Sequence, residues 1–81
     1  MIEKIAKTIL AKLYWHGYVG RRHTSIDNLP KGFPKHLRGD VKKVAKKLNK
    51  QGLVLFKPTS YGIQVSLNPR RMAEIEEIIR D

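Results

Sequence analysis

The segment Leu48–Val54, which reads Leu-Asn-Lys-Gln-Gly-Leu-Val, is the part of the chain that most strongly indicates its fold. It joins two segments of different periodicity, and Gly52 lies at the join. Before it, apolar residues recur every three or four positions from 37 to 48, as on one face of a helix. After it, Leu53–Phe56 is a continuous apolar run, as in a strand. Glycine is strongly favoured just past the end of a helix, so Gly52 marks a helix-to-strand junction.

The helix that ends at this junction is predicted over residues 34–51. Pro34 suits its first position, where the missing N–H is no loss. An apolar stripe follows, formed by Leu37, Val41, Val44, Ala45 and Leu48. The other residues of the helix are strongly basic, and Asp40 is the single acid among seven cations: Lys35, Arg38, Lys42, Lys43, Lys46, Lys47 and Lys50.

Gly39 is the anomaly of this helix, because glycine in a helix interior costs about 1 kcal/mol relative to alanine. Helical spacing places it opposite the apolar stripe, among the lysines, so core packing does not account for it. Two interpretations stay open. In one, the helix runs through Gly39 and the missing side chain lets a ligand approach closely. In the other, the helix breaks at residues 38–40 and Asp40 caps its later part.

After the junction, residues 53–57 and 63–67 are each predicted to form a strand, with 58–62 as the turn of a β-hairpin. Asn68 and Pro69 suit the cap and first turn of a final helix. The apolar side of that helix is formed by Met72, Ile75, Ile78 and Ile79. We expect these residues to pack on the first helix rather than to pair two chains.

The N-terminal part begins with an amphipathic helix over residues 2–16, closed by Gly17. Residues 17–33 are irregular, with a short strand that pairs with the hairpin and a single helical turn capped by Ser25 or Asp27. Trp15 and its neighbour Tyr14 are expected in the core, since tryptophan is highly buried on average. The alternative is that they stack on unpaired bases.

The length and the charge of the chain limit the functions that it can have. Eighty-one residues suffice for one domain, predicted as α+β over residues 1–81. Seventeen Lys and Arg against seven Asp and Glu give a net charge of +10, which attracts polyanions and exceeds what solubility requires. No apolar run approaches the ~20 residues of a membrane span, and the N-terminus lacks the pattern of a signal peptide. We therefore expect a cytoplasmic protein without a membrane partner.

The sequence predicts binding but no catalytic, metal or cofactor site. The chain has no cysteine, and its histidines, His16, His23 and His36, lie in different elements without the spacing of a zinc site. Glycine-rich phosphate loops and paired catalytic carboxylates are absent from the sequence pattern. We expect no enzyme activity, no metal and no cofactor.

The order of elements (helix, turn-rich connection, basic helix, hairpin, helix) resembles the winged helix-turn-helix superfamily of DNA-binding proteins. Leu48–Val54 looks like the Leu-three-residues-Gly-Leu-Val junction between its recognition helix and its wing. Many small archaeal and bacterial transcription regulators are built this way. The resemblance implies a three-helix core with a β-hairpin wing and a C-terminal helix. The chain departs from it at the second helix, for which Pro30, Gly32 and Pro34 leave little room.

In that superfamily the helix before the wing enters the DNA major groove by its N-terminal half, and the hairpin tip touches the minor groove or backbone. The resemblance therefore implies a transcriptional regulator that contacts duplex DNA through the basic helix 34–51 and the wing 57–62. On this chain the helix contacts would be Lys35, His36, Arg38, Gly39, Lys42, Lys43 and Lys46, and the wing contacts Lys57, Thr59 and Ser60, with Tyr61 beside them.

Within this set, lysines suit phosphates, whereas Arg38 could read a guanine, worth about 1–3 kcal/mol of discrimination. Arg21 and Arg22, which precede the short strand, could touch phosphate from the flank or simply be solvated.

Two other functions remain open. The segment from Leu37 to Val54 also looks like the equivalent helix of a small-subunit ribosomal protein shared by archaea and eukaryotes, which would favour structured RNA as the partner. Winged helices also serve as protein-interaction adaptors, although the net charge of +10 argues against that role here. The chain is expected to be a monomer or a homodimer.

Overall fold

The helix-to-strand junction forms as predicted in a computed structural model, which describes residues 2–80. Helix α2 (Arg38–Lys50) is followed by Gly52, whose φ of 80° lies in the left-handed region that glycine adopts without strain. A Cβ at this position would also lie 3.1 Å from a guanidinium nitrogen of Arg71. Strand β2 (Val54–Thr59) begins two residues later, so the turn from basic helix to strand is tight.

Two asparagine side chains hold this junction. The amide of Asn49 donates to the carbonyl of Val54 at 2.8 Å, and the amide of Asn68 donates to the carbonyl of Gly52 at 2.8 Å. Carbonyls in a turn and at the start of an edge strand lack regular partners, and these two bonds satisfy one carbonyl of each kind. The orientation of α2 relative to the hairpin is therefore fixed by side chains as well as by the backbone.

Strand β2 pairs antiparallel with β3 (Gly62–Leu67), and the two-residue strand β1 (Thr24–Ser25) pairs with the other edge of β3. The hairpin is longer than the sequence predicted, because Pro58 pairs with Ile63 and Thr59 with Gly62. Only Ser60 and Tyr61 form the turn. Proline is tolerated at position 58 because β2 is an edge strand, where its missing N–H breaks no ladder bond.

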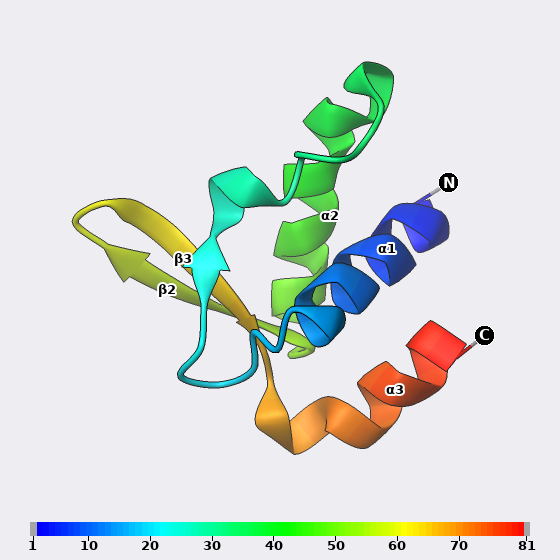
Figure 1. The fold of residues 1–81 in the computed structure, drawn as a ribbon, viewed down its shortest axis with the longest axis vertical. Coiled ribbons are helices and arrows are strands. Elements are labelled where there is room, and N and C mark those ends of the chain that lie inside the picture. Colours follow the sequence, from blue (N-terminus) through cyan, green and yellow to red (C-terminus); the bar gives the residue numbers. More distant parts are fainter. Residues whose placement is uncertain (1, 81) are drawn as a thin grey trace.

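Helix α1 (Ile2–Trp15) lies between α2 and α3 (Met72–Arg80), and the hairpin extends away on the other side of α2 (Figure 1). Within residues 2–80 the fold is an α+β domain of three α-helices and a three-stranded antiparallel sheet. One core joins the three helices to strands β2 and β3, with Ile9, Val41, Val65, Leu67 and Ile75 fully buried. The expected packing of the last helix on the first is confirmed, since α3 contacts α1 and Ile75 is part of the core.

The connection between α1 and α2 holds the single helical turn that the sequence predicted, η1 (Ile26–Asn28). Its cap is Ser25, whose Oγ accepts a hydrogen bond from the main-chain N–H of Asp27 at 3.2 Å. A similar cap precedes α3: Asn68 Oδ1 accepts from the N–H of Arg70 at 3.0 Å, and Pro69 stands at the first position of η3 (Pro69–Arg71). Both predicted caps are therefore confirmed.

The start of the basic helix differs from the prediction. The element η2 (Lys35–Leu37) is a 3₁₀ turn that follows Pro34, and the α-helix begins only at Arg38. Leu37 and Arg38 both have helical backbone angles, and Gly39 lies within α2. The helix therefore does not break at residues 38–40. Asp40 lies in the first turn of α2 and does not cap it.

The predicted burial of Trp15 is wrong, because its side chain is 77% exposed. The buried residues of α1 are Ile5, Ile9, Leu10 and Leu13, and position 15 is five residues beyond Leu10, outside the i+3 and i+4 spacing that keeps a residue on one helical face. Tyr14, four residues after Leu10, is half-buried against the core. No helix in the described range is long and apolar enough to cross a membrane.

Candidate nucleic-acid interface

Helix α2 has two faces with different chemistry. Val41, Val44, Ala45 and Leu48 are buried, whereas the lysines at the remaining positions are exposed. At helical spacing, Gly39, Lys43, Lys46 and Lys50 lie opposite the buried stripe, and Lys47 borders them. We call this surface the lysine face, formed by Lys43, Lys46, Lys47 and Lys50 with Gly39 at its N-terminal end. The lysine face arises because the helical period that gathers the apolar residues of α2 on the core side places these lysines on the other side.

Few of these charges are neutralised locally. Among residues 2–80 the salt bridges are Lys42–Asp27, with Nζ and Oδ1 2.7 Å apart, and Arg71–Glu74 at 2.6 Å. Lys42 is thus the one lysine of α2 with a carboxylate partner in this part of the chain. Its side chain is 50% exposed and that of Asp27 is 71% exposed, so the pair is largely screened and worth at most about 1 kcal/mol. Local sequence patterns do not reveal this pair, because its members lie fifteen positions apart.

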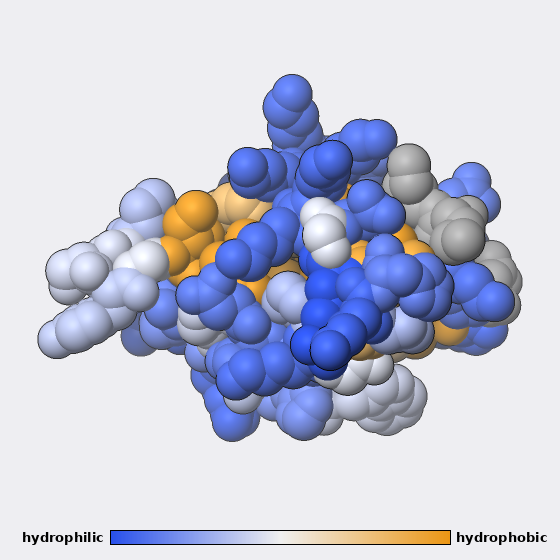
Figure 2. Space-filling model, turned by 90° about the horizontal axis from the view of Figure 1, so that it is seen from above, coloured by the Kyte–Doolittle hydropathy of each residue, from blue (hydrophilic) through white to orange (hydrophobic). Residues whose placement is uncertain are grey.

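The start of the basic segment carries three of the expected contact residues, among them Arg38, the expected base reader. Lys35 and His36 belong to η2 and are exposed, and Arg38 is the first residue of α2. The Nε of Arg38 donates to the main-chain oxygen of Phe33 at 3.1 Å, which orients the guanidinium and leaves its other N–H groups for a ligand. Figure 2 looks down on this end of the molecule, where hydrophilic side chains dominate the surface.

The hairpin tip presents polar and aromatic side chains. Lys57, Thr59 and Ser60 are exposed, and Tyr61 is 93% exposed. The hydroxyl of Thr59 donates to the carbonyl of Gly62 at 2.7 Å and accepts from the N–H of Tyr61 at 3.2 Å. Thr59 therefore closes the turn, while Ser60 and Tyr61 form its free end.

Arg21 and Arg22 lie away from the hairpin tip. Both are exposed in the loop after α1, where the N–H of Gly20 donates to the carbonyl of Leu67 at 3.0 Å. Leu67 is the last residue of β3, whereas the tip precedes its first. The structure therefore does not bring the two arginines together with Ser60 and the other tip residues.

A second polar group, not anticipated from the sequence, lies across the sheet. His23 Nδ1 is 3.1 Å from Gln64 Oε1, and Gln64 is paired directly with Lys57 of β2. Directly opposed residues of an antiparallel pair share a face. His23, Gln64 and Lys57 thus form one polar row next to the hairpin, and only the strand register reveals it.

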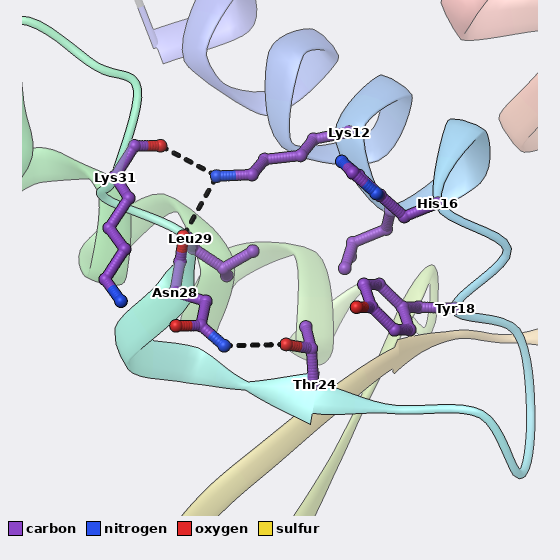
Figure 3. A pocket seen from close by; sticks show the side chains of 8 residues that line it. Lys12, His16, Tyr18, Thr24, Asn28, Leu29 and Lys31 are labelled. Carbon is purple, nitrogen blue, oxygen red and sulfur yellow. Dashed lines mark hydrogen bonds between the residues drawn. The ribbon is translucent and has the colours of Figure 1, made fainter.

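Lys12 differs from the other lysines because its ammonium binds the main chain. Its Nζ donates to the carbonyl of Asn28 at 2.9 Å and to that of Lys31 at 2.7 Å (Figure 3). Burial, together with the nearby charge of Lys31, lowers the pKa of Lys12 below its ordinary value of 10.5. The bonds tie the loop before η2 to α1, above a pocket of about 200 Å³ that His16 and Tyr18 line on the far side. Lys12 therefore holds in place the loop that leads into the basic segment.

The described residues contain no group of three or more His, Asp or Glu side chains arranged to hold a metal ion. Comparison with protein-family models, with curated proteins and with solved structures gives no match to this chain.

Proposed function

We propose that this chain is a winged-helix protein that binds duplex DNA, with α2 in the major groove and the β2–β3 hairpin against the neighbouring backbone or minor groove. The observation that carries the proposal is the lysine face. Its four ammonium groups lie on one exposed helix surface, without carboxylate partners among residues 2–80. An unneutralised row of this kind is the electrostatic footprint of a phosphate-binding element.

The proposed roles differ along α2. Lysines of the lysine face contact phosphates, which provides affinity and register but no sequence code. Arg38 and His36, at the N-terminal end, are the groups that would meet base edges, as is expected for a helix that enters a groove by its first turns. The exposed hairpin tip, with Ser60 and Tyr61, would follow the backbone beside that groove. Binding of this kind suits a transcriptional regulator.

The proposal is tested by the salt dependence of binding. In the double variant Lys43→Ala, Lys46→Ala, the slope of log affinity against log salt should become shallower by about 1.8, which is about 0.9 for each lost phosphate contact. Fluorescence anisotropy with a labelled duplex measures the slope. The matched control is Lys31→Ala, Arg70→Ala, which removes the same charge from exposed positions outside α2 and the hairpin and should leave the slope nearly unchanged.

Two outcomes would refute this assignment. If both double variants lower the slope equally, binding reflects only the net charge and not the lysine face. If a structured RNA of the same length binds more tightly than the duplex at every salt concentration, the partner is RNA. The ribosome- or RNA-associated alternative would then replace the proposal, because A-form helices are recognised through phosphates and 2′-hydroxyls.

A further inference from the structure

Trp15, the single tryptophan of the chain, is held in an exposed position at the end of α1. Its side chain is 77% exposed, yet its ring packs edge-to-face on Tyr14 with centroids 5.3 Å apart and planes at 89°. The hydroxyl of Tyr14 donates to Glu76 of α3 at 2.8 Å, a bond that raises the pKa of Tyr14 above its ordinary value of 10.0. The indole is therefore preorganised at the seam between α1 and α3. Ordered, exposed tryptophans are enriched among the residues that dominate protein interfaces.

A groove lies directly beside this indole. It measures about 260 Å³ and is lined by Tyr14, Trp15, Glu76, Ile79 and Arg80. Pockets for drug-sized ligands measure roughly 300–1,000 Å³, so this groove suits a single large side chain instead. Ile79 offers an apolar wall, and the guanidinium of Arg80 can lie over an aromatic ring in a cation–π contact. An indole therefore fits the chemistry of the groove.

The charge of this surface argues against a polyanion as its partner. Helix α3 carries three glutamates against one arginine, whereas the whole chain has a net charge of +10. A polyanion is disfavoured beside these carboxylates. A second copy of this chain, by contrast, meets less repulsion here than on the lysine face of α2.

We propose that two copies of the chain associate through this surface about a two-fold axis, with Trp15 of each copy in the groove of the other. A protruding side chain and a groove that accepts it, side by side on one patch, satisfy the self-complementarity that a two-fold interface requires. Helix α1 lies between α2 and α3 (Figure 1), and no residue of α2 lines the groove beside Trp15, so both lysine faces stay exposed in the pair. The proposal does not depend on what the lysine face binds.

The test combines sedimentation velocity with the emission of Trp15, which reports on its own burial because it is the only indole in the chain. Over about 1 μM to 1 mM, the range of weak to moderate affinity, we expect the mass to double and the emission to shift to the blue. Association should strengthen with added salt, which screens the repulsion between two cationic copies. Polyanion binding responds in the opposite direction.

Two variants and one control locate the surface. Trp15→Ala should weaken association about tenfold or more, as expected for a central interface tryptophan, and Arg80→Ala should weaken it while keeping the indole as a probe. Both side chains are exposed, so neither change disturbs the core. Tyr61→Ala removes an equally exposed aromatic from the hairpin tip and should have no effect on association. A monomeric mass at all concentrations in high salt overturns the proposal. So does a Trp15→Ala variant that loses nucleic-acid affinity at unchanged mass, which would assign Trp15 to base stacking.

Discussion

Gly39 is the residue at which stability and the proposed binding make opposite demands. It lies within a continuous helical segment, since the 3₁₀ turn η2 precedes α2 without a break. A Cβ at Gly39 would meet no atom within 4 Å, so nothing in the folded chain requires glycine there. Alanine would fit, and it would restrict the unfolded chain. The glycine is explained if a groove wall lies close to this end of the lysine face.

The variant Gly39→Ala separates the two demands. It should stabilise the fold by about 0.5–1 kcal/mol, the difference between alanine and glycine in a helix. Thermal melting measures this gain, at roughly 4–8 °C per kcal/mol for a domain of this size. Affinity for duplex DNA should fall in the same variant, because the added methyl group occupies the space of closest approach. A variant that is more stable and binds equally well would show that Gly39 does not touch the ligand.

Among the elements, η1 and α2 share a salt bridge that reduces the positive charge presented by α2. Asp27 lies on η1, which Ser25 caps, and its carboxylate forms a salt bridge with the ammonium of Lys42. If Lys42 is to contact a phosphate, as the family resemblance implies, it must first leave Asp27. The exposed pair stabilises the fold only weakly, so its main effect falls on binding.

Asp27→Asn should therefore strengthen duplex binding and steepen the log-salt slope by as much as about 0.9, the value of one additional phosphate contact. Stability should change by less than about 1 kcal/mol, as for other exposed ion pairs. The matched control is Glu74→Gln, which breaks the other exposed salt bridge, with Arg71, outside α2 and the hairpin. If Asp27→Asn and Glu74→Gln raise affinity equally, the gain reflects net charge and not the release of Lys42.

The elements that the sequence predicted well are those that local rules determine. The stripe ending at Leu48, the glycine at position 52 and the caps at Ser25 and Asn68 each depend on neighbours within a few residues. The position of Pro58 inside β2 was missed, because only the pairing of β2 with β3 shows that β2 is an edge strand.

In the candidate site, too, local features could be predicted from the sequence and contacts between distant residues could not. The lysine face follows from helical period alone. The contacts of Lys12 with the carbonyls of Asn28 and Lys31, and that of Lys42 with Asp27, join residues fifteen to nineteen positions apart. Periodicity carries no information about such pairs, so the sequence could not distinguish the free lysines from the engaged ones.

At the scale of the whole molecule, the lysine face is a source of instability in the free protein. Like charges three or four residues apart on a helix destabilise it by about 0.2–0.5 kcal/mol per pair. Helix α2 contains six such pairs at exposed positions: Arg38–Lys42, Lys42–Lys46, Lys43–Lys46, Lys43–Lys47, Lys46–Lys50 and Lys47–Lys50. The net charge of +10 adds a repulsion over longer distances. A polyanion that binds the folded state relieves both.

This repulsion predicts how the stability of the free protein responds to salt. The screening length falls from about 30 Å at 0.01 M to about 10 Å at 0.1 M, so the melting temperature should rise as sodium chloride is added. The double variant Lys43→Ala, Lys46→Ala removes four of the six pairs in α2. It should melt at a higher temperature than the unmodified chain at low salt, and its melting temperature should rise less as salt is added. A short duplex should raise the melting temperature of the unmodified chain most at low salt, because it binds only the folded state. Differential scanning calorimetry measures all three effects. A melting temperature that falls as salt is added would mean that attractive pairs such as Lys42–Asp27 outweigh the lysine repulsion, and the lysine face would then not be the dominant electrostatic feature of the fold.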